Sequence, residues 1–164
     1  MDVKIIRSSR RLRTVSARLE QDLLVVNAPA MLSEAHLEKI VSDFKVKFEK
    51  KRLKDELDKR ESLLDIASRL NRKFFADSLK INSIEYVTSH KSKFGCCDYR
   101  KRSIRISHRV GLMPDWVRDY VIIHEMAHLL EPNHGRSFWG IVSRYKLAER
   151  ARGYLMAAGG SNGK

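Results

Sequence analysis

The stretch YVIIHEMAHLL, residues 120–130, decides the fold that we expect. It is apolar nearly all round, which predicts a largely buried helix. His124 and His128 stand four residues apart on one helical face, so both imidazoles can point at one ion, while Glu125 can reach a water on that ion. Burying two histidines and a carboxylate is costly unless they have partners. A divalent cation supplies the missing partner.

A third histidine favours this interpretation over the simpler one, in which the histidines are ordinary core residues and the glutamate is a chance neighbour. His134 follows the helix break that Pro132 predicts. A chain that turns back there can bring His134 to the same ion, giving three protein ligands and a water, as in catalytic zinc sites. Glu131 is the rival third ligand, because it lies seven residues after His124 on the same face, but imidazole suits zinc well.

The periodicity on either side of this helix predicts an α+β fold. Alternating residues and a polar turn at 20–22 predict an N-terminal β-hairpin over residues 7–27. Beyond it we expect helices at 34–57 and 63–77, strands at 84–88, 94–99 and 103–107, and helices at 116–130, 135–145 and 148–158. The expected architecture is a single domain with a small β-sheet packed on helices, one of which carries the metal site.

Length and composition bound the class of protein. The chain has 164 residues, 43% of them hydrophobic, which suits one domain and excludes disorder throughout. We expect a domain over 1–158 and a flexible tail at 159–164. No apolar run reaches the roughly 20 residues of a membrane span, and residues 1–7 are too weakly apolar for a secretory signal. A cytoplasmic protein without membrane contact is therefore expected, and the adjacent Cys96 and Cys97 do not indicate an oxidising compartment.

The chain is strongly basic, with 33 Lys and Arg against 20 Asp and Glu and a formal net charge of +13. Seven of the bases lie in segment 90–109, together with one acid, Asp98, and the aromatic residues Phe94 and Tyr99. This pattern predicts a DNA or RNA contact beside the metal helix. The alternative is the solvated face of an edge strand. Gly95 in the same segment indicates a bulge or a close backbone approach.

Short motifs are spread along nearly the whole chain: RRLRTVS at 10–16, FGCC at 94–97, SIRIS at 103–107, MP at 113–114, DYVIIHEMAHL at 119–129, EPNH at 131–134 and FW at 138–139. Together they resemble the YgjP-like family of zinc metallopeptidases. The resemblance implies a zincin-like fold, with zinc held by His124, His128 and His134. Glu125 is then the catalytic acid and base. The resemblance also implies a relation to SprT-like and WLM proteases, which act on proteins attached to DNA. Cys96 stands where the family's usual motif has serine.

The resulting hypothesis is a zinc-dependent peptidase that acts on protein or peptide substrates. Zinc lowers the pKa of its water, Glu125 takes the proton, and the hydroxide attacks a peptide carbonyl that the metal polarises. Glu125 then passes the proton to the leaving amine. Tyr145, Arg136 and His108 are candidate donors to the transition state, each with a structural or solvent-facing role as the alternative.

Two other functions are compatible with the same motif. A nucleic-acid-associated binding protein would hold a structural metal, closed by a fourth protein ligand such as Cys97. A metal-dependent hydrolase can also act on a non-peptide bond, because this motif activates water without choosing the electrophile. Cys96 and Cys97 are otherwise interpreted as structural, since adjacent thiolates have poor geometry for binding one ion.

Overall fold

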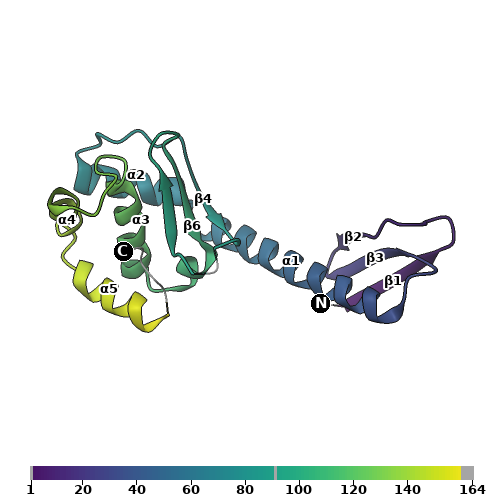
Figure 1. Ribbon diagram of the computed structural model, residues 1–164. Coiled ribbons are helices and arrows are strands. Elements are labelled where there is room, and N and C mark those ends of the chain that lie inside the picture. The colour runs from purple at the N-terminus through teal and green to yellow at the C-terminus, as the bar shows by residue number, and fades with distance from the viewer. Residues whose placement is uncertain (1, 91, 160–164) are drawn as a thin grey trace. The chain divides into compact units, whose positions relative to one another are not determined.

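A computed structural model describes residues 2–90 and 92–159. Runs of short strands and runs of helices follow one another along the chain (Figure 1), which confirms the predicted α+β class. The chain divides into two compact units, which we call the N-terminal unit (Met1–Arg52) and the C-terminal unit (Leu53–Lys164). The predicted domain bounds, 1–158, stay a prediction. Of the expected tail, residues 160–164 lie outside the described residues.

The N-terminal unit contains a three-stranded sheet with the order β1-β3-β2. β2 (Ser16–Glu20) and β3 (Leu23–Pro29) form the predicted antiparallel hairpin, whose turn contains Gln21 with a φ of 55°. The sequence does not predict β1 (Asp2–Ser8), which pairs in parallel with β3. Residues 9–15 therefore connect the two outer strands, and the hairpin begins at Ser16 rather than at residue 7.

α1 (Glu34–Arg60) begins at the predicted residue and runs three residues beyond the predicted end at 57. Apolar residues spaced by three and four positions along its first part face the sheet, as the helical period requires. The buried core of the N-terminal unit consists of Leu24, Val26, Ala28 and Leu37. Val41, Phe44 and Phe48 of α1 are partly buried and pack against it.

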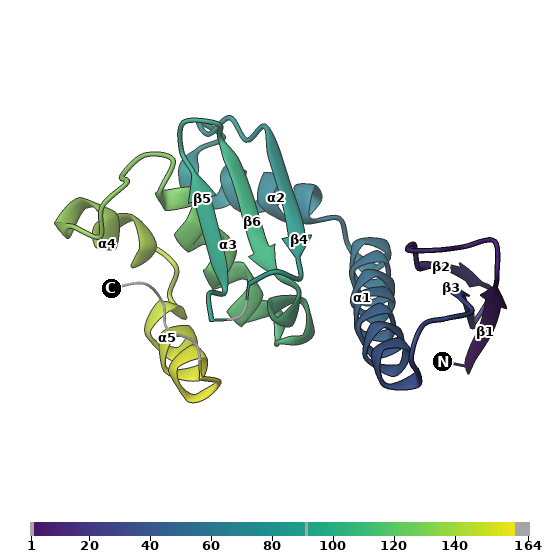
Figure 2. The same cartoon turned by 45° about the vertical axis from the view of Figure 1, so that its right-hand side comes forward.

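The C-terminal unit contains a second three-stranded sheet, with the order β4-β6-β5. β4 (Ser83–Val87) runs parallel to the central strand β6 (Ser103–Ser107), and β5 (Gly95–Asp98) runs antiparallel to β6 at the edge. All three strands lie within one residue of their predicted bounds. Figure 2 shows α2 (Leu63–Phe75) and α3 (Asp115–Ala127) behind this sheet, and both helices pack on it.

α2 begins where the sequence predicts, because Ser62 caps it: the Ser62 Oγ accepts a hydrogen bond from the Leu64 backbone N–H at 3.2 Å. The helix ends at Phe75 rather than at residue 77. Ala76 follows in the left-handed conformation, with a φ of 50°, and stops the helix.

α3 begins after Pro114 as predicted but ends at Ala127 rather than at Leu130. Residues 128–131 form a tight turn instead, in which the N–H groups of Leu130 and Glu131 donate to the Ala127 carbonyl at 3.0 and 2.9 Å. Pro132 disfavours helical backbone at Glu131, and the chain leaves the helix one turn earlier than the apolar pattern predicts. This early end matters for the site described below.

The remaining helices differ little from expectation. A 3₁₀ helix, η1 (His108–Leu112), joins β6 to α3. α4 (Arg136–Val142) is shorter than the predicted 135–145, because Arg144 and Tyr145 donate to carbonyls three residues back and tighten its end into turns. α5 (Ala148–Ala157) ends one residue early. Among the residues that the structure describes, no helix has the length and apolar character that crossing a bilayer requires.

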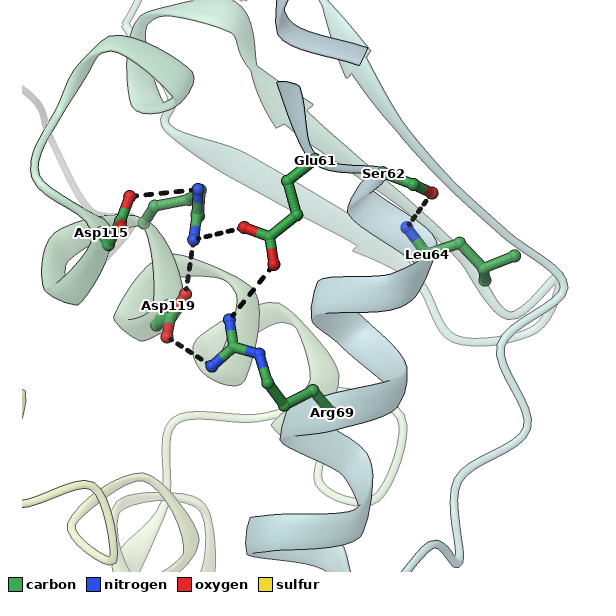
Figure 3. Close-up of polar contacts among 7 residues, drawn as sticks. Glu61, Ser62, Leu64, Arg69, Asp115 and Asp119 are labelled. Atoms are coloured by element: carbon green, nitrogen blue, oxygen red, sulfur yellow. Dashed lines mark hydrogen bonds and ion pairs between the residues drawn. The ribbon is translucent and has the colours of Figure 1, made fainter. Parts of the chain in front are cut away.

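An ion-pair network joins the start of α2 to α3 (Figure 3). Arg118 of α3 lies at its centre, with guanidinium nitrogens 3.2 Å from Glu61, 3.2 Å from Asp115 and 3.3 Å from Asp119. Arg69 of α2 completes the network, 3.4 Å from Asp119 and 3.9 Å from Glu61. The Arg118 side chain is only 11% exposed, so water screens its contacts less than those of a surface pair. The network therefore helps to orient α3.

Candidate metal centre

Three histidines meet at the C-terminal end of α3. His124 lies in the last turn of α3, His128 follows the last helical residue, and His134 lies in the loop before α4. The Nε2 atom of His134 lies 3.1 Å from Nε2 of His124 and 3.0 Å from Nε2 of His128. The turn at residues 128–131 reverses the chain, and this reversal brings the third imidazole to the first two.

Phe138 of α4 supports all three imidazoles. Its ring is fully buried, and its centroid lies 4.8 Å from that of His124, 4.5 Å from that of His128 and 4.6 Å from that of His134. Trp139 stacks on His134 with ring centroids 5.6 Å apart. The apolar pattern predicts that both aromatic residues pack inward but does not predict these contacts. Close packing against these two aromatic rings restricts the orientations that the imidazoles can adopt.

All three histidines favour the neutral form. Burial lowers the pKa of His124 to about 3, with further lowering by His128, His134 and Arg152. Burial also lowers the pKa of His128 and of His134. A neutral imidazole keeps one nitrogen lone pair free, which is the form that binds a metal ion.

A backbone contact sets which nitrogen of His128 is free. The His128 Nδ1 lies 3.2 Å from the carbonyl oxygen of Glu131, and because a carbonyl only accepts, Nδ1 carries the proton. The lone pair is then on Nε2, the atom that faces the other histidines. Glu131, the rival third ligand, thus supports the cluster through its backbone, and its carboxylate is not among the described side chains that cluster there.

The donor set and its spacing fit a divalent metal ion. Tetrahedral zinc with Zn–N bonds of about 2.0–2.1 Å holds its ligand nitrogens roughly 3.3 Å apart. The two Nε2 separations of 3.0 and 3.1 Å are close to that value. Lone pairs at this distance repel one another unless a proton or a metal ion lies between them. Imidazole nitrogen suits zinc, copper, iron and nickel, so the donor set fits a class of metals.

Glu125 is buried beside the histidines, with 6% of its surface exposed. Its carboxyl lies against the backbone of Gly95 in β5, which confirms the close backbone approach that this glycine indicates. Burial raises the pKa of Glu125 to about 8, and Lys93 acts in the opposite direction. A carboxyl that titrates near neutrality can both accept and release a proton within one reaction cycle.

The histidines and Glu125 line a cavity of about 280 Å³. The edge strand β5 and its neighbours form the rest of the wall, with Lys93, Phe94, Gly95, Cys96, Cys97, Tyr99 and Pro132. Sequence reasoning does not assign Lys93 and Tyr99 to the site, because their place depends on how β5 packs against α3. The sequence feature that points to Lys93 and Tyr99 is their position on either side of Gly95, the glycine that indicates a close backbone approach.

A family model matches most of the chain: the YgjP-like, metallopeptidase domain aligns with residues 26–150. The chain belongs to the YgjP-like metallopeptidase family. Membership confirms the resemblance noted in the sequence. It makes this YgjP-like protein a metal-dependent peptidase, with proteins or peptides as substrates.

The crystal structure of the metallopeptidase zymogen of Pyrococcus abyssi abylysin is similar to this YgjP-like chain. The two sequences are 19% identical, and the match covers 57% of this chain and 91% of the abylysin chain with a TM-score of 0.48. A search of curated proteins found no match.

The two cysteines of the YgjP-like chain line the cavity without joining the histidine cluster. Burial raises the pKa of Cys97 to about 12, and the neighbouring Glu125 carboxylate adds to this effect. In the metal-free chain a thiol with such a pKa stays protonated. The Cys96 Sγ lies 3.7 Å from Nε2 of His90. The metal-capable cluster among the described residues contains three histidines and no cysteine, so Cys97 does not close the site as a fourth ligand.

None of the three candidate transition-state donors lines the cavity. The Tyr145 hydroxyl donates to the Trp116 carbonyl at 2.9 Å. Nδ1 of His108 lies 3.4 Å from the Val87 carbonyl, and Arg136 is exposed at the start of α4. A structural role therefore describes Tyr145 and His108 better than a role as donor to the transition state, and a solvent-facing role describes Arg136 better. Lys93 and Tyr99, which do line the cavity, can donate a hydrogen bond to a substrate.

The basic segment 90–109 does not present all of its charges together. The Arg109 guanidinium lies 5.0 Å from the Phe94 ring centroid, with Nε and Nη2 buried. Arg100 lies over the exposed ring of Tyr99 at 5.8 Å, while Lys93 faces the cavity. Lys91 lies outside the described residues. The nucleic-acid contact stays a prediction.

Proposed function

We propose that this YgjP-like protein is a zinc-dependent peptidase in which His124, His128 and His134 hold the metal and Glu125 is the general base and acid. One observation carries the proposal: three Nε2 atoms converge beside a buried carboxyl in a single cavity. Three histidines are a ligand set that zinc enzymes use when one coordination position stays open for chemistry.

The chemistry divides between the metal and the chain. When bound, zinc supplies a Lewis acid that activates water and polarises a peptide carbonyl. Glu125 accepts a proton from the attacking water as the new carbon–oxygen bond forms. It delivers that proton to the amide nitrogen as the carbon–nitrogen bond breaks, so the products are a carboxylic acid and an amine.

The surroundings of Glu125 support this role. Burial favours the protonated carboxyl and raises the pKa of Glu125 in the metal-free chain to about 8, so the surroundings suit a group that holds the proton before passing it to the leaving nitrogen. Lys93, at the cavity wall, acts in the opposite direction and keeps the carboxylate form accessible. The supported imidazoles hold the reacting groups in place, and such positioning is a large part of catalysis.

Metal analysis with a matched pair of variants tests the ligand assignment. We expect wild-type protein to bind one zinc per chain and to cleave casein, and His134→Ala to lose both properties. His36→Ala is the control, because His36 is exposed in α1 and lies outside the histidine cluster. Retained zinc and retained cleavage in His134→Ala would contradict the proposal. Zinc bound by wild type without cleavage of casein or any peptide tested would favour a structural metal or a non-peptide substrate.

A contact between segment 90–109 and DNA or RNA is a separate prediction. If these bases track a phosphate backbone, affinity falls steeply with added salt, because each neutralised phosphate releases counterions. Titration of labelled single-stranded DNA and RNA at low and moderate salt measures this. Absence of binding at low salt would remove the prediction and leave the peptidase proposal intact.

A further inference from the structure

Gly95 lies where a side chain would meet the carboxyl of Glu125. A Cβ built on Gly95 would stand 2.7 Å from Oε1, 2.8 Å from Cγ and 2.9 Å from Cδ of Glu125. Non-bonded carbon contacts are favourable at about 3.5–4.0 Å, and both carbon–carbon distances are far below that range, while the distance to the oxygen is shorter still. Glu125 therefore packs directly on the backbone of β5.

The backbone of β5 cannot retreat from this contact. Gly95 pairs with Ile106 of the central strand, and the Phe94 carbonyl accepts a hydrogen bond from the Ser107 N–H at 2.8 Å. The side chains of Phe94 and Ile106 are buried, and the guanidinium of Arg109 covers the Phe94 ring. Moving this part of β5 would break strand pairing and open the core at the same time.

The helix backbone that carries Glu125 cannot move away from β5 either. Its helix neighbours Ile122 and Met126 are fully buried, and α3 is held against α2 by the Arg118 network. The remaining freedom is in the glutamate side chain itself, which borders the cavity. A methyl group at residue 95 would therefore move the carboxyl and leave the helix where it is.

We infer that Gly95 is a positioning residue: the absence of a side chain at this point of β5 fixes the Glu125 carboxyl relative to the histidine cluster. The catalytic consequence rests on the proposed function, whereas the contact itself does not. Misplacement of a reacting group by about 1 Å costs on the order of 10²-fold in rate. Gly95→Ala is therefore expected to act on turnover.

Thermal melting of four metal-free proteins tests the contact independently of any activity: wild type, Gly95→Ala, Glu125→Ala and the double variant. Overpacking against Glu125 should lower the midpoint of Gly95→Ala by roughly 2–10 °C. In the Glu125→Ala background the obstructing side chain is gone, and alanine at residue 95 should leave the midpoint unchanged or raise it. An equal loss in both backgrounds would overturn the inference.

Two other glycines serve as controls. Gly153 of α5 meets no atom within 4 Å, so Gly153→Ala should be harmless in both backgrounds. A Cβ on Gly111 would stand 2.7 Å from a methyl carbon of Leu57, so Gly111→Ala should lower the midpoint equally in both backgrounds. Only alanine at residue 95 should respond to Glu125.

Kinetics of the zinc-loaded proteins test the catalytic consequence. Gly95→Ala should bind zinc with unchanged stoichiometry and lose kcat by on the order of 10²-fold with KM little changed. Gly111→Ala should keep its kcat below its melting temperature, which separates positioning from general destabilisation. Unchanged kcat in Gly95→Ala would overturn the inference. If wild type cleaves no peptide, the proposed function fails and the melting cycle alone decides whether Gly95 positions Glu125.

Discussion

The two sheets of the molecule share one topology and differ in what lies against them. In each, the first strand runs parallel to the third, which is central, and the second runs antiparallel to it. The N-terminal sheet packs on an apolar face of α1, including Phe44 and Phe48. The C-terminal sheet packs on α3, which buries His124 and Glu125 among its apolar residues. The shared strand arrangement therefore does not by itself create the site, which also needs His124 and Glu125 of α3 and the two histidines that follow this helix.

The antiparallel edge strands of the two sheets, β2 and β5, differ in how far their residues are exposed. β2 exposes Ser16, Arg18 and Glu20, and its Arg18–Glu20 ion pair is open to water. β5 is half-buried along its length and reads Gly-Cys-Cys-Asp. Small residues on β5 leave room for a cavity between the strand and α3, whereas large side chains would fill it. The comparison predicts that matched substitutions in the two units have different consequences.

The largest difference is expected for two core phenylalanines. Phe138→Ala removes a fully buried ring, which should cost about 3–5 kcal/mol of unfolding free energy. It also removes the support beneath the histidines, and loss of such support typically weakens metal affinity by about 10–100-fold. Phe44→Ala in the N-terminal core should lower stability without changing zinc affinity. Denaturant unfolding and competition with a zinc indicator measure the two effects. Equal zinc affinity in both variants would contradict the supporting role of Phe138.

A smaller difference, in the free energy of unfolding, is expected between alanine variants of Arg118 and Arg18. Arg118→Ala takes one partner from each of Glu61, Asp115 and Asp119, of which Glu61 and Asp119 keep Arg69, at a cost of about 1–3 kcal/mol after allowing for the exposure of Glu61 and Asp115. Arg18→Ala breaks an exposed pair and should cost less than about 1 kcal/mol. Urea unfolding of both variants at low and high salt measures this. Similar losses would show that the Arg118 network behaves as surface charge.

The last effect concerns pH, and it separates metal-free wild type from Glu125→Gln. The pKa of Glu125 is raised to about 8 in the folded protein from an ordinary value of 4.5, so the folded state keeps a proton that the unfolded chain releases. Its contribution to stability is full below pH 4.5 and is lost as pH rises toward 8. Metal-free wild type should therefore lose stability relative to Glu125→Gln over this interval. Comparison with that variant cancels the opposite effect of His124, whose lowered pKa stabilises the fold above pH 6.5 and is lost on acidification. Parallel curves for the two proteins would contradict the burial of Glu125.

Sequence periodicity predicts most helices and strands of the C-terminal unit, because these elements follow from residues that are close together in the sequence. The residues of β4 and β6 alternate clearly between polar and apolar, and the break at Pro132 identifies His134 as the returning ligand candidate. β1 escapes prediction because its pairing with β3 is parallel and non-local, and its own residues mix charged with apolar. The Gly95 contact and the placing of Lys93 depend on the packing of β5 against α3, which no local pattern encodes.

The most direct test of the central claim compares zinc-loaded wild type with Glu125→Gln on one peptide substrate. Glutamine keeps the shape of the side chain, so zinc should bind with the same stoichiometry. Glutamine cannot accept the proton, and kcat should fall by at least about 10²–10⁴-fold, the usual contribution of general acid–base catalysis. Full peptidase activity in a zinc-loaded Glu125→Gln protein would contradict the assignment of Glu125 as the group that moves the proton.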